Sequence, residues 1–343
     1  MLSFGKSLLT SLDMPYRDSL EVKALSFGVD VAGAVLGEGA DAQALSPSVC
    51  LVAGIRGDEV HQTLICSLLA HKLAGLEQER SLAPGKRITV IPCANSSSMG
   101  IGRRFWPGDN TDVNRMFPGY NAGETTQRIA AGIFDQVRGY RYGIHFSSFY
   151  LCGDFVPHVR IMHGPGETAN HGCDFGLPFV VHHVPGSFDT TTLHYNWRLW
   201  DTEAYTFYTD KTDLADLEAA HDAVRSVLRF LSARGIVRKA TFGGKHATQL
   251  SEHALVPVFA SSGGIFCPMV KPGEIVDAGQ TLATVISTRY GTMRATLVAP
   301  CEGMVFYVAR TPLANRQTLA FQIVPPDATR ESTERGNFLD PEA

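Results

Sequence analysis

Two adjacent carboxylates, Asp58 and Glu59, stand where a short apolar run gives way to a helical pattern. The apolar run at residues 49–55 predicts a buried strand, and the apolar spacing that follows predicts a helix. Functional groups of α/β proteins gather where strands end and helices begin. Carboxylates at such a point can bind a metal ion, or they can stabilise the positive N-terminal end of the helix. The turn alone favours the second, structural interpretation.

A loop-like stretch at residues 103–119 concentrates cationic side chains. It contains Arg103, Arg104 and Arg115, with Asn114 directly before the last of them. Guanidinium groups bind carboxylates through paired hydrogen bonds, and an asparagine adds a directional donor. A surface loop with internal salt bridges is the plainer interpretation, but interleaved aromatic residues make a merely solvated loop a poor description. The stretch therefore favours recognition of an anion.

Histidines are numerous, and one of them ends a predicted strand. The chain has 12 histidines, and seven of them fall within residues 145–194. His145 stands in the predicted strand at 143–149, where a lone histidine is typical of a core residue with satisfied hydrogen bonds. The cluster lacks HxH or HxxxH spacing, so its pattern alone indicates a metal only weakly. Nucleophile-elbow, phosphate-loop and dinucleotide-binding motifs are absent from the sequence.

Alternating strands and helices must position these residues. Each predicted strand is a short apolar run, and each predicted helix repeats apolar residues at helical intervals. The strands cover 49–55, 87–93, 143–149 and 204–209, and the helices cover 60–76, 125–137 and 214–231. Strands separated by helices of this length predict an α/β fold with a mixed, mostly parallel sheet flanked by helices.

The pattern changes after residue 235 from alternating elements to short strands. Residues 236–254 are polar and glycine-containing and are interpreted as a linker. Two similar hairpin-like halves follow, with QTLA recurring at 280–283 and 317–320, and they predict a small all-β barrel-sandwich domain at 255–325. The polar tail at 326–343 is expected to be loose. Residues 287–300 offer no lysine for a swinging arm, so we expect the β domain to serve packing or homo-oligomerisation.

Composition excludes several classes of partner. Thirty basic residues against 34 acidic residues give a net charge of −4, which argues against nucleic acid or an anionic membrane as the main partner. No uninterrupted apolar run is long enough to span a membrane, and no signal peptide is recognisable. Seven scattered cysteines without a CxxC pair are typical of reduced, buried cysteines in a cytoplasmic protein.

Three stretches, taken in order and spacing, resemble the motifs of the succinylglutamate desuccinylase/aspartoacylase family of zinc carboxypeptidase-like hydrolases. The family's GxHGxE turn corresponds to residues 54–59, its RxxPxDxxDLNRxFPG stretch to residues 104–119, and its DLH strand end to residues 143–145. The all-β region resembles the lipoyl-like barrel that follows the hydrolase domain in many members. The resemblance covers nearly the whole chain and implies a carboxypeptidase-like hydrolase domain at 1–235.

The resemblance implies a zinc centre. In that family, the histidine and glutamate of the turn and the later histidine bind one zinc ion, and a glutamate in a TxExG context activates the metal-bound water. Glu59 and His145 match two of the three ligand positions. Zinc lowers the pKa of bound water toward about 7, and a nearby carboxylate can then take its proton.

The resemblance also assigns the cationic stretch. Arg104 corresponds to the arginine that polarises the scissile carbonyl, where a cation stabilises the developing oxyanion. Asn114 and Arg115 correspond to the pair that holds the free carboxylate of the substrate. Arg103, beside this motif, is a further candidate for substrate binding.

Two positions depart from the family pattern. The third zinc ligand should be a histidine, but the residue there is Arg56, whose guanidinium stays protonated and cannot ligate a metal. The catalytic glutamate is replaced by Tyr208, because Thr206 aligns with the threonine of TxE. Tyr208 is therefore a candidate catalytic residue. The nearest carboxylates are Glu203, before the strand and a second candidate, and Asp210.

These departures leave two arrangements open. Asp58, His61 or His158 could supply the missing zinc ligand. Alternatively, Arg56 could occupy the place of the metal and pair with Glu59, which would abolish hydrolysis by the zinc mechanism.

The predicted function is a metal-dependent amide-bond hydrolase, with zinc as cofactor, that deacylates an N-acyl amino acid or a similar small acidic amide. The alternative is a metal-free, non-catalytic family member that binds a small carboxylate metabolite through Arg104, Asn114 and Arg115. In both cases the partner is a small molecule that carries a carboxylate.

Overall fold

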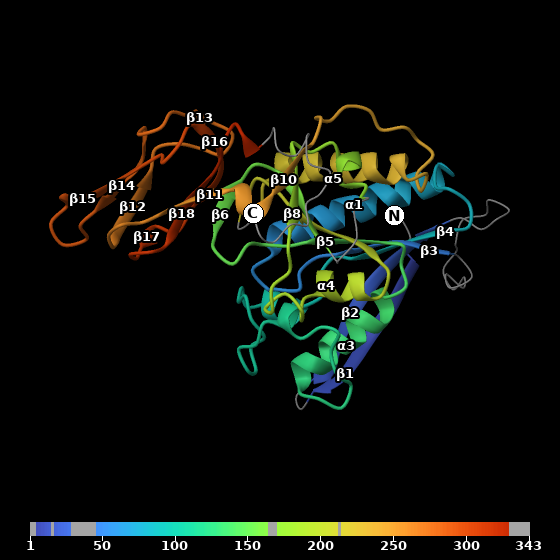
Figure 1. Cartoon of the computed structure of the whole chain (residues 1–343). Coiled ribbons are helices and arrows are strands. Elements are labelled where there is room, and N and C mark those ends of the chain that lie inside the picture. The colour runs from blue at the N-terminus through green and yellow to red at the C-terminus, as the bar shows by residue number, and fades with distance from the viewer. Residues whose placement is uncertain (1–4, 15–16, 29–45, 164–169, 212–213, 329–343) are drawn as a thin grey trace.

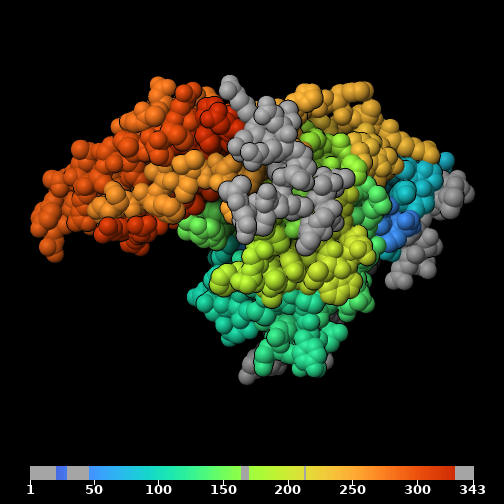
Figure 2. Space-filling model, viewed as in Figure 1, coloured from blue at the N-terminus to red at the C-terminus, as the bar shows by residue number. Residues whose placement is uncertain are grey.

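The computed structural model describes residues 5–14, 17–28, 46–163, 170–211 and 214–328. It contains an α/β region, built around a large sheet, and a C-terminal β domain that extends to one side of it (Figure 1 and, in space-filling form, Figure 2). The fold class predicted from the sequence is confirmed.

The large sheet has nine strands in the order β1-β2-β4-β3-β5-β9-β7-β8-β10. Neighbouring strands from β4 to β9 are parallel, as are β7, β8 and β10, whereas β1, β2 and the β7–β9 pair are antiparallel. The strands are β1 (Gly5–Met14), β2 (Arg17–Gly28), β3 (Ser46–Val52), β4 (Lys86–Ile91), β5 (Tyr142–Phe146), β7 (His158–Met162), β8 (Phe179–His183), β9 (Glu203–Tyr208) and β10 (Thr248–Ser251).

Helices cover both faces of this sheet, because successive side chains of a strand point to opposite faces. Residues Val49 and Leu51 of β3 share one core with α1 (Val60–Gln78) and α5 (Leu217–Ala233). Cys50 and Val52 share the other core with α3 (Thr125–Val137) and α4 (Leu193–Leu199). In Figure 1, α1 and α5 lie above the sheet, and α3 and α4 lie below it.

Short helices complete the connections. They are α2 (Ser96–Met99) and the 3-10 helices η2 (Val113–Arg115), η3 (Gly172–Phe175) and η4 (Glu252–Ala254). No helix in the described ranges has both the length and the apolar character needed to cross a membrane.

Two antiparallel sheets form the C-terminal β domain. One is ordered β11-β18-β16-β13, and the other is ordered β15-β14-β12-β17. Strand β6 (Gly153–Phe155), which belongs to the α/β region by sequence, pairs with β16 and so joins the two regions. The strands of this domain are β11 (Val256–Phe259), β12 (Gly264–Pro268), β13 (Ile275–Val276), β14 (Thr281–Ile286), β15 (Met293–Val298), β16 (Gly303–Ala309), β17 (Leu313–Ala314) and β18 (Leu319–Val324).

The structure differs from the sequence-based expectation at several boundaries. The interpreted linker at 236–254 includes β10, which pairs with β8 and extends the large sheet. Most of the predicted polar tail, from residue 329 onward, lies outside the described residues. All seven cysteines are free, but only Cys50 and Cys66 are buried; Cys152 and Cys173 are exposed.

Candidate ligand-binding site at the ends of β3, β5 and β9

The turn that follows β3 is shaped by a close backbone approach. A Cβ atom on Gly57 would lie 2.3 Å from the carbonyl oxygen of Arg103 and 2.3 Å from the carbonyl carbon of Ser98. The Gly57 N–H also donates to the carbonyl oxygen of Arg104 at 3.1 Å. Glycine at this position therefore lets the turn pack directly against the loop that carries the predicted anion-binding residues.

Glu59 is fully buried and its carboxylate is saturated with hydrogen bonds. Oε1 accepts from the N–H and the hydroxyl of Ser148, both at 3.0 Å, and Oε2 accepts from the N–H of Arg56 at 3.1 Å. Although Glu59 precedes α1, its side chain makes no capping hydrogen bond. The structural interpretation of this carboxylate as a helix cap is wrong, because its oxygens are directed toward Ser148 and Arg56 instead.

Arg56 lies at the centre of the site and is only 6% exposed. Its Nε and Nη2 both donate to Asp112 Oδ2 at 3.0 Å, and its Nη1 donates to Glu59 Oε1 at 3.4 Å and to the Ser147 hydroxyl at 3.2 Å. Burial by itself would lower the pKa of Arg56, but Asp112 and Glu59 outweigh that effect and raise the pKa above its ordinary value. A permanent positive charge therefore sits between two carboxylates.

His145, at the end of β5, is buried beside this charge. It is 1% exposed, and its Nε2 has no hydrogen-bond partner among the described residues. Burial and, to a smaller extent, the nearby Arg56 together lower the pKa of His145 to about 3, while Asp112 opposes the shift. The imidazole is therefore neutral at physiological pH, with one ring nitrogen left for a ligand.

A small cavity of about 100 Å³ opens beside Arg56 and His145. Asn114 and Arg115 line it: Asn114 Oδ1 accepts from the Leu193 N–H at 3.3 Å, and the Arg115 side chain is 41% exposed. Arg115 donates to the carbonyl oxygen of Phe188 and lies 3.8 Å from an Asp189 carboxylate oxygen. The structure thus brings together four residues that the sequence had singled out, namely Arg56, Asn114, Arg115 and His145.

Strand β9 forms one wall of this cavity through Thr206 and Tyr208. The Thr206 hydroxyl is hydrogen-bonded to His194 Nδ1 at 2.6 Å. The Tyr208 ring stacks on His158 with ring centroids 4.9 Å apart, and the Arg160 guanidinium lies over the Tyr208 ring at 5.6 Å. One aromatic and one cationic neighbour therefore hold the Tyr208 ring. Tyr208 is the residue at which the family resemblance predicts a glutamate.

Among the predicted site residues, Arg103, Arg104 and Glu203 neither line the cavity nor contact Arg56. Arg104 donates to Asp58 Oδ2 at 3.0 Å and to the carbonyl oxygen of Phe149 at 3.2 Å, and Arg103 is exposed. Glu203 begins β9, so five residues, or about 16 Å of extended chain, separate it from Tyr208. Its carboxylate is instead hydrogen-bonded to His171 at the opposite end of the strand.

The residues of this site do not fit a zinc ion. The guanidinium of Arg56 lies beside Glu59, and no group of three or more His, Cys, Asp or Glu side chains in the described part of the chain is arranged to hold a metal. The three alternative ligands are also directed elsewhere. Asp58 pairs with Arg104, His61 Nδ1 accepts from the Asp216 N–H at 3.3 Å, and His158 Nδ1 is hydrogen-bonded to the Val156 carbonyl oxygen at 2.9 Å.

Several residues of the site were missed by sequence reasoning. Ser147 and Ser148 lie two and three residues after His145, and Asp112 lies in the cationic stretch. Their closeness in sequence to predicted site residues was the signal that could have identified them. His194 and Arg160 reach the cavity from α4 and β7, and no motif singles them out.

The comparison with known proteins agrees with these motifs. Residues 46–147 match the succinylglutamate desuccinylase/aspartoacylase catalytic domain. The matched segment contains all three of the motifs identified in the sequence. The family is one of amide-bond hydrolases that includes deacylases.

One curated relative and several solved structures resemble the chain. The N-alpha-acetyl-L-2,4-diaminobutyric acid deacetylase of Halomonas elongata is 30% identical over 84 residues, which span 24% of this chain and only 23% of that protein. The product-bound ectoine utilization protein EutE of Ruegeria pomeroyi has a TM-score of 0.73 at 19% identity, covering 93% of both chains. A succinylglutamate desuccinylase/aspartoacylase of Rhodobacter sphaeroides has a TM-score of 0.74 at 18% identity, covering 94% of this chain and 95% of that one. These structures share the fold over nearly the whole chain.

Proposed function

We propose that this protein is a zinc-free member of its family that binds a small carboxylate-bearing amide or amino acid derivative. The observation that carries the proposal is the guanidinium of Arg56, which is hydrogen-bonded to both Glu59 and Asp112. A fixed cation there takes over the electrostatic role that a metal would have toward the two carboxylates. It cannot activate a water as a Lewis acid, because it offers no vacant orbital to coordinate the water oxygen.

The cavity offers a complementary set of groups for such a ligand. Arg115 is partly exposed at the cavity wall, and the hydrogen bond of Asn114 Oδ1 leaves its amide NH₂ group directed to no other described residue. An arginine and an amide donor together suit a carboxylate. The uncharged His145 and the Tyr208 hydroxyl, which line the same cavity, are suited to the neutral amide part of the ligand.

Metal-dependent deacylation is the competing function. The match to the family's catalytic domain favours it. The name of the Halomonas relative favours it too, since that relative is a deacetylase of an N-acetylated amino acid. It requires a third metal ligand, and the side chains of Asp58, His61 and His158 are engaged elsewhere.

The test measures metal content, binding and turnover on the same preparation. The protein is expressed with added zinc and analysed by mass spectrometry for metals, and it is then mixed with N-acetyl-L-aspartate, N-succinyl-L-glutamate and N-acetyl-L-2,4-diaminobutyrate in turn. We expect less than a tenth of an equivalent of zinc and no hydrolysis. At a hundredfold excess over Kd, a bound compound should raise the Tm by about 4 °C.

Two variants make the binding test specific. Arg115→Ala should abolish the rise in Tm, because it removes the cation that faces the ligand carboxylate. Arg103→Ala is the matched control, since Arg103 belongs to the same loop but does not line the cavity, and it should leave the rise unchanged. One equivalent of zinc, together with zinc-dependent hydrolysis of any of the three compounds, would refute the proposal in favour of the deacylase.

A further inference from the structure

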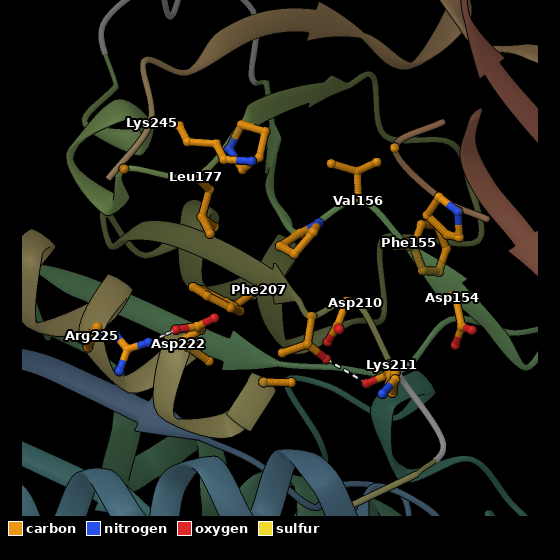
Figure 3. A pocket seen from close by; sticks show the side chains of 18 of the residues that line it. Asp154, Phe155, Val156, Leu177, Phe207, Asp210, Lys211, Asp222, Arg225 and Lys245 are labelled. Atoms are coloured by element: carbon orange, nitrogen blue, oxygen red, sulfur yellow. Dashed lines mark hydrogen bonds and ion pairs between the residues drawn. The ribbon is translucent and has the colours of Figure 1, made fainter. Parts of the chain in front are cut away.

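A second and much larger cavity, of about 870 Å³, lies where the α/β region meets the β domain. Its walls come from β6, from the end of β9, from α5, from the segments at 176–178 and 244–245, and from the β-domain loop at 271–273. Figure 3 shows these side chains converging on one space. None of the residues of the proposed function lines it.

The two cavities lie on opposite faces of the same strand. Thr206 and Tyr208 of β9 line the small cavity, whereas Phe207 and, just after the strand, Thr209 line the large one. This alternation follows from the two-residue period of a strand. A ligand of the large cavity therefore cannot contact Arg56 or His145, and the two sites are physically separate.

The middle of the large cavity is apolar. Phe155, Val156, Leu177 and Phe207 line it, and Figure 3 shows them between the charged side chains that stand toward the ends. Apolar walls of this kind bury the hydrocarbon or aromatic body of a small molecule, while a few polar groups fix its orientation.

Five cations and three carboxylates line the cavity, and the carboxylates are those of Asp154, Asp210 and Asp222. Lys211 and Arg225 are paired with Asp216 and Asp222, so their charges are neutralised within the chain. Three further cations, Lys245, Lys271 and Arg229, line the cavity without a carboxylate partner among the described residues. Arg229 donates only to neutral oxygens, those of the Phe175 carbonyl and the Ser226 hydroxyl.

The wall that carries Lys245 is built by two glycines. A Cβ on Gly176 would lie 2.7 Å from Arg229 Nε, and a Cβ on Gly244 would lie 3.0 Å from the same atom. Both glycines have positive φ angles, of 63° and 104°. The Lys245 N–H then donates to the Gly176 carbonyl oxygen at 2.8 Å, which holds this lysine at the cavity edge.

We propose that this cavity is a second binding site, for a small organic anion with an apolar or aromatic body and a carboxylate, sulfonate or phosphate group. The apolar centre takes the body of the ligand. Lys245 lines the cavity from the α/β region and Lys271 lines it from the β domain, so an anionic group at either wall meets a cation.

The test uses 8-anilinonaphthalene-1-sulfonate, an aromatic anion that fluoresces when its rings are buried, and the uncharged N-phenyl-1-naphthylamine as its matched neutral probe. The full-length protein should bind the anion more tightly than the neutral probe. The double variant Lys245→Ala/Lys271→Ala should weaken binding of the anion about fivefold, because two partly solvated charge contacts are lost, and it should leave the neutral probe unaffected.

Two control variants and one cavity-filling variant establish where the probe binds. Lys72→Ala/Lys86→Ala removes two exposed lysines that do not line the cavity, and it should leave anion binding unchanged. Arg115→Ala, in the small cavity, should also have no effect, so this outcome is independent of the proposed function. Ala219→Trp, which fills the large cavity from α5, should weaken both probes. The proposal is overturned if the anion does not bind, if both lysine double variants bind it equally, or if Arg115→Ala weakens it as much as Lys245→Ala/Lys271→Ala does.

Discussion

Arg56 determines the electrostatics of the small cavity. It is held by Asp112 on one side and by Glu59 and Ser147 on the other, so its position is set by five hydrogen bonds rather than by packing alone. A buried ion pair of this kind is costly to break, because removal of one partner leaves a carboxylate without compensation. The site is therefore organised around the arginine.

Replacement of this one residue should create a metal site. Arg56→His completes the family's GxHGxE turn and places a third ligand type beside Glu59 and His145. We expect close to one equivalent of bound zinc in Arg56→His, against almost none in the wild type, measured by metal analysis of protein produced with added zinc.

Stability gives a second measurement on the same variant. Without zinc, Arg56→His should be destabilised by about 3 kcal/mol, because Asp112 loses its partner inside the protein. Zinc should restore part of that loss. Arg103→His, on the exposed neighbouring loop, is the control and should bind no zinc. An Arg56→His protein that folds but takes up no zinc would show that the surrounding carboxylates and hydroxyls, not Arg56 alone, prevent metal binding.

The sequence predicted the residues of the site better than it predicted the hydrogen-bond partners of their side chains. Glu59, His145, Asn114 and Arg115 were found because they stand in contiguous motifs. The engagement of Arg104 with Asp58, and of Glu203 with His171, depends on side-chain directions that a motif does not contain. The rise per residue along β9 was enough to predict that Glu203 lies too far from Tyr208 to act beside it.

At the scale of elements, a glycine in β5 sets how closely α4 approaches the sheet. A Cβ on Gly143 would lie 2.6 Å from Cε3 of the fully buried Trp197. Trp197 in turn donates from Nε1 to the Val137 carbonyl oxygen at 3.0 Å, at the end of α3. The same helix α4 brings His194 to Thr206, so this packing contact reaches the cavity wall.

Gly143→Ala should therefore destabilise the protein by about 2 kcal/mol, because the indole must move out of a closely packed site. The measurement is the free energy of unfolding in urea. Gly75→Ala is the matched control: it lies within α1, its Cβ would have no neighbour within 4 Å, and it should stabilise the protein by about 0.5–1 kcal/mol. Equal effects of the two substitutions would contradict the packing argument.

Long periodic elements were predicted well and the pairing between elements was not. The helix predicted at 125–137 coincides with α3, because its apolar spacing is regular. Strand β10 was missed because its four residues are mostly polar and only Leu250 is fully buried, so its strand structure comes from pairing with β8. The β1–β2 hairpin also went unpredicted, because its sequence contains no continuous apolar run of the kind that indicated the other strands.

At the scale of the whole molecule, the two regions share one hydrophobic core. Phe155 and Val156, together with Phe179, Val181 and Leu250 of the large sheet, pack into the same cluster as the buried residues of the β domain. Strand β6 also adds main-chain hydrogen bonds to β16, and the rings of Phe155 and Tyr307 lie 4.6 Å apart. Such an interface is more extensive than a flexible linker between independent domains would provide.

We therefore expect a single cooperative transition when the protein is unfolded in a calorimeter. Gly153→Leu should split this transition into two. A Cβ at Gly153 would lie 2.1 Å from the Tyr307 ring and would force β6 away from β16, so the two regions would unfold separately. Gly75→Leu, in α1, where a Cβ would meet no atom within 4 Å and φ is not positive, controls for the loss of a glycine. Two resolved transitions in the wild-type protein would mean that the regions unfold independently.

Under the proposed zinc-free function, the guanidinium of Arg56 would also make the site independent of the metal supply of the cell. A zinc centre is empty during zinc starvation, loses its ion to a chelator, and can be occupied by copper, which nitrogen and oxygen ligands bind more tightly than zinc. The positive charge between Glu59 and Asp112 is covalently attached to the chain and is present from the moment the protein folds. Every copy of the protein therefore carries the same charge at this point, irrespective of which metals the cell contains.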